Sequence, residues 1–265
     1  MSQLKVLFLG DIVGKIGRKA VKEVLPKLKR NYKPDFIIAN GENLAHGKSV
    51  TEKTLKEMTD AGIDFFTSGN HIWANAESEQ ILCEQKFDII RPANYPEGTP
   101  GPGYKIVEVG TKKVLVANMM GRVFFREDFR DPFEGMTDIL EQEKGKYDFS
   151  IVDLHAEATS EKVSFAKYLD GKVDLVIGTH THVQTADEKI LEKGTGFISD
   201  AGMTGAKDSS IGVDFKNVLH MFLTQMPKSF EIPETGACIV NGVFAIIKQD
   251  KGVSKIERVS EEVEV

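Results

Sequence analysis

Short apolar runs alternate with helix-like segments along most of this chain of 265 residues. Residues 4–9, 36–40 and 64–68 form apolar runs of strand length. Each is followed by a stretch in which apolar residues recur with helical spacing, and these stretches predict helices over 17–31, 51–61 and 74–86. Strands that alternate with helices usually lie parallel in one sheet. The first third of the chain therefore predicts an α/β protein with a parallel sheet covered by helices.

The middle of the chain interrupts this alternation. Residues 104–109 and 113–119 flank Gly110 and Thr111, a pattern that predicts an antiparallel hairpin. The elements expected after it are helices at 133–144, 160–169 and 215–225 and strands at 149–154, 173–178, 189–191, 196–199, 237–248 and 255–259. Such a set fits a mixed sheet or two packed sheets. The Pro- and Gly-rich segment 92–103 is interpreted as a surface loop, so we expect a single domain over residues 1–265.

Composition excludes several classes of protein. The chain is 41% hydrophobic and 28% charged, and none of its apolar runs approaches the ~20 residues of a membrane-spanning helix. The N-terminus lacks the pattern of a secretory signal, so we expect a soluble, cytoplasmic protein that does not bind membranes. A net charge of −6 argues against an extended nucleic-acid surface. Cys83 and Cys238 lie far apart in the sequence and are expected to be buried free thiols.

Polar residues with metal-binding side chains follow the predicted strands. They are Asp11, Glu42, Asn43, Asn70, His71, His155, His180 and His182. The carboxyl ends of parallel strands share one edge of a sheet, so these side chains should converge. An extended backbone over 180–182 would direct both histidines to one side. Nitrogen and oxygen ligands without a thiolate suit iron, manganese or zinc.

Each of these residues also has an ordinary explanation. Asp11 follows a glycine, as turn residues do, and His155 alone is more often a hydrogen-bonded histidine than a ligand. The pair His180 and His182 is the most specific single signal. Independent turns would not place complementary ligands at successive strand ends, so the ordered set favours a metal site.

The ordered set resembles the motifs of the calcineurin-like metallophosphoesterases. That pattern runs Asp, an acidic residue, Gly-Asn-His, His, and His-x-His after glycine. Here it is Asp11, Glu42, Gly69-Asn70-His71, His155 and Gly178-Thr179-His180-Thr181-His182. The usual D-x-H is Asp11-Ile12-Val13, so one histidine is missing, and the usual Gly-Asp is Gly41-Glu42. With Asn40-Gly41-Glu42-Asn43 and Asp200-Ala201-Gly202-Met203-Thr204-Gly205, the chain resembles the YmdB-like branch over nearly its whole length.

The resemblance implies a fold, a cofactor and an activity. The fold would be that of the calcineurin-like metallophosphoesterases, an α/β fold of mixed sheets in a β-sandwich flanked by helices. Two divalent or trivalent ions, iron or manganese with zinc as the alternative, would share Glu42 as a bridge. Asp11, Glu42, Asn43 and His182 would hold one ion, and Glu42, Asn70, His155 and His180 the other. The activity would be hydrolysis of small 2′,3′- or 3′,5′-cyclic nucleotides by a homo-oligomer, a dimer or tetramer.

The expected mechanism follows from general chemistry. Two ions about 3.5–4 Å apart lower the pKa of a shared water and stabilise the charge that develops on the phosphoryl group. Hydroxide then attacks the phosphodiester. His71 is placed to protonate the leaving alkoxide, although a role in orienting Asn70 is the alternative. Arg122 and His46 are weaker candidates for contacts with the substrate.

Two other classes of function fit the same residues. A phosphatase or nuclease could use the same metal site on a different ester. A non-catalytic nucleotide sensor could bind the metal and signal by occupancy. The phosphodiesterase, the phosphatase or nuclease, and the sensor differ in whether they turn over an ester and in whether they prefer diesters to monoesters.

Overall fold

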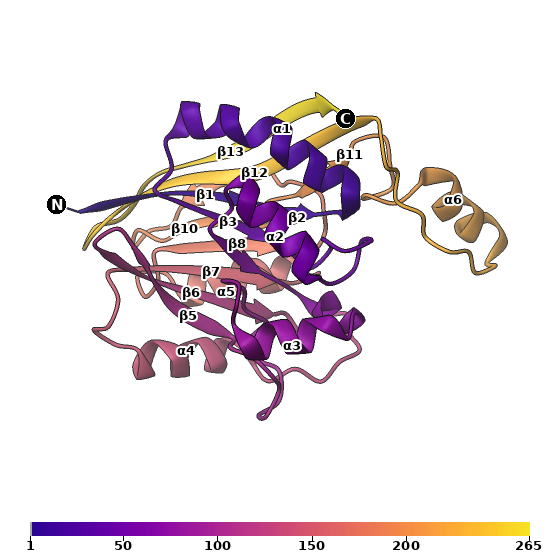
Figure 1. Cartoon of the computed structure of the whole chain (residues 1–265). Helices are drawn as coiled ribbons and strands as arrows, with labels where there is room; N and C mark the ends of the chain where they lie inside the picture. The colour runs from indigo at the N-terminus through magenta and orange to yellow at the C-terminus, as the bar shows by residue number, and fades with distance from the viewer. Residues whose placement is uncertain (1) are drawn as a thin grey trace.

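The computed structural model describes residues 2–265, and the strands in this range belong to two sheets that pack face to face (Figure 1). The first sheet has the order β2-β11-β12-β1-β3-β4, with β13 paired to β12. Its strands β1, β3 and β4 run parallel, and β12 is antiparallel to β1. The strands of this sheet are β1 (Gln3–Leu9), β2 (Asp11–Ile12), β3 (Phe36–Asn40), β4 (Phe65–Thr67), β11 (Met203–Ala206), β12 (Ala237–Lys248) and β13 (Gly252–Glu264).

The second sheet has the order β5-β6-β7-β8-β10-β9. Its strands are β5 (Tyr104–Val109), β6 (Lys112–Met120), β7 (Phe149–His155), β8 (Leu175–Thr179), β9 (Lys189–Ile190) and β10 (Gly196–Ile198). Strands β6, β7 and β8 are parallel, whereas β5 pairs antiparallel with β6. The expected hairpin is therefore confirmed.

Helices cover the outer faces of the sandwich. They are α1 (Gly14–Tyr32), α2 (Glu52–Ala61), the 3₁₀-helix η1 (Asn70–Ala74), α3 (Glu77–Glu84), α4 (Pro132–Gln142), α5 (Thr159–Tyr168) and α6 (Phe215–Thr224). Helices α1, α2 and α3 pack on the first sheet, and α4 and α5 on the second. Helix α6 instead projects to the right of the body in Figure 1. None of the helices in residues 2–265 combines the length and apolar character needed to cross a bilayer.

Alternating side chains explain why the strands form continuous apolar runs in the sequence. In β1, Phe8 points into the core between the sheets, whereas Leu7 and Leu9 lie in the core beneath the helices. In β7, Ile151 belongs to the core between the sheets and Val152 to the core beneath α4 and α5. Both faces are buried, so both faces must be apolar. The predicted α/β fold with a β-sandwich flanked by helices is confirmed.

The strand ends that carry the candidate ligands lie on both sheets. Sheet one supplies the residues after β1, β3 and β4, and sheet two supplies the residues at the ends of β7 and β8. The expectation that they share one edge of a single sheet is wrong. They meet because the two sheets stack with these carboxyl ends at the same end of the sandwich, where the loop after β3 touches β7.

Several local expectations differ from the structure. The helix expected over 74–86 is shorter in the structure, where α3 spans only Glu77–Glu84 and the 3₁₀-helix η1 precedes it. The short strands β2 and β11 have no counterpart among the expected elements, and they pair parallel with each other. Cys238 is buried as expected, but Cys83 is exposed on α3.

The core between the sheets should dominate the stability of the fold. Phe8 is fully buried there, so Phe8→Ala should lower the free energy of unfolding by about 3–5 kcal/mol, because it removes buried apolar contacts and leaves a cavity. Phe222→Ala is the matched control, since Phe222 is 71% exposed on α6 and its loss should change stability by less than about 0.5 kcal/mol. Urea unfolding followed by circular dichroism measures both. Equal changes would contradict this account of the core.

Candidate metal centre and its cavity

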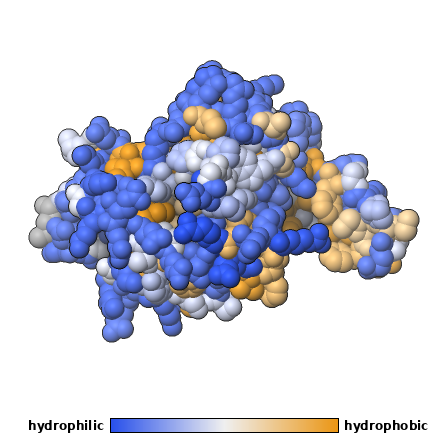
Figure 2. Space-filling model, turned by 90° about the horizontal axis from the view of Figure 1, so that it is seen from below, coloured by the Kyte–Doolittle hydropathy of each residue, from blue (hydrophilic) through white to orange (hydrophobic). Residues whose placement is uncertain are grey.

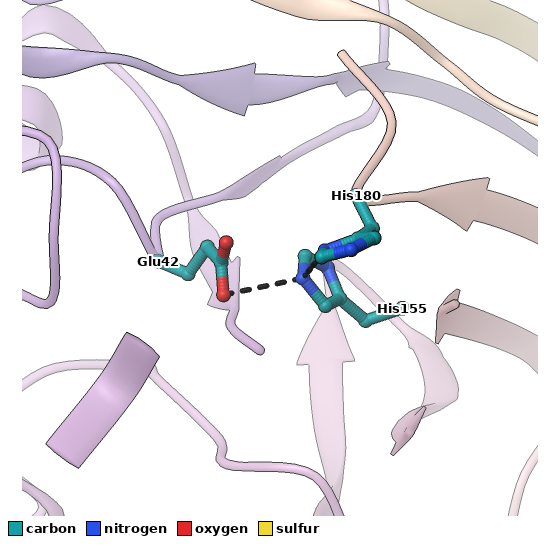
Figure 3. A group of neighbouring side chains, drawn as sticks. All are labelled: Glu42, His155 and His180. Atoms are coloured by element: carbon teal, nitrogen blue, oxygen red, sulfur yellow. Dashed lines mark hydrogen bonds and ion pairs between the residues drawn. The ribbon is translucent and has the colours of Figure 1, made fainter. Parts of the chain in front are cut away.

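The carboxylate of Glu42 lies at the middle of the site. Glu42 follows β3, and its backbone N–H donates to the side-chain oxygen of Asn40 (3.0 Å), which fixes the start of the loop. The side chain is buried, with Oε2 3.2 Å from Nε2 of His155 and Oε1 3.2 Å from Nδ1 of His71. Figure 3 shows Glu42, His155 and His180 directed toward one another from separate segments. Residues from both sheets therefore meet at one carboxylate.

Two groups of potential ligand atoms share this carboxylate. Glu42, His155 and His180 form one group, and Asp11, Glu42 and His182 form the other. Within each group the ligand atoms lie within 4.8 Å of one another. Nδ1 of His180 is 3.0 Å from Nε2 of His155, a close approach of two ring nitrogens that a shared cation would stabilise.

Three buried oxygens beside these groups lack hydrogen-bond partners within residues 2–265. They are Oδ1 of Asp11, Oδ1 of Asn43 and Oδ1 of Asn70. The amide of Asn43 donates to the carbonyl of Gly47 (2.8 Å), and this bond orients its oxygen. A buried oxygen without a partner costs free energy, and a cation would satisfy it. Carboxylate, amide and imidazole donors together fit hard or borderline metal ions.

Gly69 keeps open the space between the ligand groups. A Cβ atom at this position would clash with Oε2 of Glu42 and would lie 2.5 Å from Nε2 of His155. Any side chain here would push these two ligand atoms apart. The glycine of the Gly69-Asn70-His71 motif is therefore required by space. Together with the unpartnered oxygens, the ligand groups fit bound metal ions.

Outward hydrogen bonds orient the three histidine rings. Nδ1 of His155 lies 2.8 Å from the hydroxyl of Thr179, which itself donates to Asp153. Thr179 has a single hydroxyl proton, so it accepts from Nδ1–H of His155 and leaves Nε2 facing the site. Nε2 of His180 pairs with Glu157 (3.2 Å), and Nδ1 of His182 lies 2.8 Å from the carbonyl oxygen of Ile211. Each ring thus presents its other nitrogen to the ligand groups.

The backbone that carries His180 and His182 is not extended. Both residues have positive φ, 100° and 65°, so the expectation of alternating side chains on an extended strand is wrong. Asp200 stabilises this unusual turn by accepting from the backbone N–H (3.0 Å) and hydroxyl (2.8 Å) of Thr181. Lys162 is buried beneath it and donates to Asp200 (2.7 Å) and to the carbonyl of Thr179 (2.8 Å). Hydrogen bonds, rather than strand pleating, bring the two rings together.

Burial and mutual charge shift the pKa values of these groups. Burial raises the pKa of Asp11 to about 6, although His182 and His155 oppose it. Burial also acts against the charge on His155, but the carboxylates of Glu42 and Asp11 outweigh it and raise its pKa to about 9. Burial and the positive charge on His155 lower the pKa of His180 to about 3. The site therefore concentrates negative charge around His155, where a cation is favoured.

The remaining predicted residues lie at different distances from the ligands. His71 and His46 line the same cavity as Glu42, Asn43, His180 and His182, and this cavity has a volume of about 750 Å³. Arg122 lines a separate cavity and pairs with Asp131 (3.0 Å). Phe125 lies between the two regions, because it lines the Arg122 cavity and its ring centroid is 5.0 Å from that of His180. A substrate contact by Arg122 or His46 stays a prediction.

Sequence reasoning missed the polar residues beneath the ligands. Asn40, Asp153 and Thr179 are fully buried and hydrogen-bonded to one another under His155. Asn40 and Asp200 belong to motifs noted in the sequence, but the motifs alone assign them no role. A polar residue inside a strand that is buried on both faces is the signal that could have found them, because burial requires a partner.

Comparisons with known proteins agree with the motifs. A family model described as YmdB-like protein matches residues 7–259. The chain is 43% identical over 256 residues to the 2′,3′-cyclic-nucleotide 2′-phosphodiesterase of Bacillus subtilis (strain 168), and the match covers 97% of this chain and 96% of the relative. A hypothetical protein from Thermus thermophilus has a similar crystal structure, with a TM-score of 0.91, 39% identity and coverage of 98% and 99%. The crystal structure of a novel phosphatase from Mycoplasma pneumoniae is also similar, with a TM-score of 0.92 and 34% identity, and the match covers 100% of this chain and 95% of the phosphatase.

The hydroxyl of Thr179 should contribute to metal affinity. Thr179→Val removes the group that orients His155, so the affinity for Mn²⁺ should fall by about 10–100-fold while the fold is kept. Competition with a chelating dye measures the affinity. Thr137→Val on α4 is the control and should bind Mn²⁺ as the wild type does. Equal affinities in all three proteins would exclude an orienting role for Thr179.

Proposed function

Because this chain belongs to the YmdB-like family, we propose that it hydrolyses 2′,3′-cyclic nucleotides with two metal ions held around Glu42. The chain is an enzyme that acts on phosphoric esters, in agreement with the sequence resemblance. The observation that carries the proposal is the pair of ligand groups that share one buried carboxylate. A relative that is 43% identical is named for the 2′,3′ ring, and nothing in the comparisons favours the 3′,5′ ring.

We assign each ion a set of residues from the two groups and, for the amides of Asn43 and Asn70, from the family resemblance. Asp11, Glu42, Asn43 and His182 would hold one ion. Glu42, Asn70, His155 and His180 would hold the other. When bound, the two ions lower the pKa of a water molecule and stabilise negative charge on the phosphoryl oxygens. We propose iron or manganese for this donor set, with zinc as the alternative.

His71 is the residue that we propose as the general acid. Its Nδ1 faces Glu42 and Asn43, and within residues 2–265 its Nε2 makes no hydrogen bond. Its side chain is 33% exposed and lines the cavity, so the protonated ring can donate from Nε2 to a bound substrate. In the reaction, a water molecule gives one proton to the solvent and its oxygen forms a bond to phosphorus. The bond from phosphorus to one ribose oxygen breaks, and that oxygen takes the proton from His71, which regains a proton from the solvent.

A phosphatase is the second candidate function. A relative with 34% identity and a TM-score of 0.92 is described as a novel phosphatase. The same ligand groups would serve a monoester, since both reactions place negative charge on phosphoryl oxygens. The two candidates differ in which ester is hydrolysed faster.

Metal content and turnover of 2′,3′-cyclic AMP should respond differently to two substitutions. Asp11→Ala removes a proposed ligand and should lose both metal and activity. His71→Ala should keep the metal but lose about 10²–10⁴-fold in kcat, because a general acid contributes that much. His220→Ala is the matched control, since His220 is exposed on α6. Metal analysis and chromatographic measurement of the adenosine monophosphate formed measure both; metal without turnover of any ester in the wild type would favour a nucleotide sensor.

Ester preference separates the two enzymatic candidates. The wild type should hydrolyse bis(p-nitrophenyl) phosphate with a higher kcat/KM than p-nitrophenyl phosphate, because a diesterase site fits a phosphorus atom with two ester oxygens. Release of p-nitrophenolate measures both rates. The reverse preference would indicate a phosphatase.

A further inference from the structure

The cavity next to the metal ligands has an apolar wall that the proposed chemistry does not use. Beside Glu42, Asn43, His71, His180 and His182, the cavity is lined by Val13, Ile211, Val213, Phe230 and Ile232. Residues 211–213 and 230–232 flank α6 in the chain, so apart from Val13 the wall is the base of the arm, residues 211–234, that carries this helix (Figure 1). Figure 2 shows apolar surface along the same arm. The polar part of the cavity suits a phosphate ester, and the apolar part suits a different portion of the same molecule.

Several contacts attach this wall to the body of the protein. The side chain of Ile232 packs against Gly14 and Gly47, and a Cβ on Gly47 would clash with its Cδ1. The carbonyl of Ile211 lies 2.8 Å from Nδ1 of His182. The backbone N–H of Asp214 donates to the carbonyl of Glu231 (2.8 Å), which joins the two segments.

The C-terminal end of the arm is also attached to the body. Lys15 pairs with the carboxylate of Glu234 (2.7 Å), and Lys19 donates to its backbone carbonyl (3.0 Å). These contacts therefore hold the wall in place on the body, next to the ligand candidate His182.

The wall presents apolar side chains to the solvent in the cavity. Phe230 is 54% exposed and Ile211 is 53% exposed. Exposed apolar surface that lines a cavity indicates an apolar portion of a ligand. In a nucleotide whose phosphate lies at the ligand groups, the portion with flat apolar faces is the base.

We propose that this wall binds the nucleobase of the substrate and that Phe230 stacks on it. The proposal rests on the proposed function, since it needs the phosphate at Glu42. Stacking on an aromatic ring is favourable for every base, because every base has a π-face. Phe230 is then a specificity-determining residue that separates nucleotides from phosphodiesters without a base.

Two substrates that differ in the base test the wall. One is 2′,3′-cyclic AMP, and the other is glycerol 1,2-cyclic phosphate, which has the same five-membered ring and no base. For Phe230→Ala, kcat/KM on cyclic AMP should fall by about 10–100-fold, mainly through KM, because one stacking contact is lost. The value on the glycerol diester should stay within about twofold, since that substrate does not reach Phe230.

Two further variants control the experiment. Phe230→Trp should restore kcat/KM on cyclic AMP, because tryptophan also stacks. Phe222→Ala, on the exposed side of the same arm, should change neither substrate. Equal loss on both substrates in Phe230→Ala, or no loss on the nucleotide, would overturn the proposal.

A binding measurement distinguishes failure of the wall from failure of the proposed function. Calorimetry gives the Kd of adenosine 3′-phosphate for the metal-loaded wild type and for Phe230→Ala. A weaker Kd in the variant supports the wall even if the wild type hydrolyses neither diester, in which case only the proposed activity fails. An unchanged Kd overturns the wall whatever the activity is.

Discussion

The contact between Glu42 and His155 joins the two sheets at the site. Glu42 follows β3 of the first sheet, and His155 ends β7 of the second, with 3.2 Å between Oε2 and Nε2. Both side chains are buried, so their charges interact with little screening by water. Any shift of one sheet against the other would separate these atoms. The apolar core between the sheets therefore sets the geometry of the ligand groups.

The polar residues beneath the ligands also make the geometry of the site depend on the packing of the two sheets. Asn40, Asp153 and Thr179 come from strands of both sheets and form one hydrogen-bonded group. A half-satisfied network of this kind would be costly, which makes its members mutually dependent. This hydrogen-bonded group, together with the turn that Asp200 and Lys162 stabilise, fixes the orientation of the His155 and His180 rings.

Much of the fold could be predicted because its strands are buried on both faces. The range of β3, residues 36–40, follows directly from an apolar run of that length. The two-residue strand β2 could not be predicted, since its pairing with β11 depends on a distant segment. The ligand candidates could be identified because the motifs place them at strand ends. The positive φ values of His180 and His182 could not, because they depend on hydrogen bonds to Asp200, which lies beyond strand β10 in the sequence. Periodicity indicates α6 as a helix, yet it cannot show that the helix leaves the body.

The arm that carries α6 has a different relation to the site from that of the other elements. All proposed ligands lie in or directly after strands of the sandwich or in η1, whereas Phe230 and Ile232 belong to a long insertion between β11 and β12. Apart from the carbonyl of Ile211, which orients His182, the two parts of the cavity can therefore diverge separately during evolution. Substitutions or changes of length in this insertion could alter which molecules are accepted, while the residues around Glu42 and the reaction that they support remain the same.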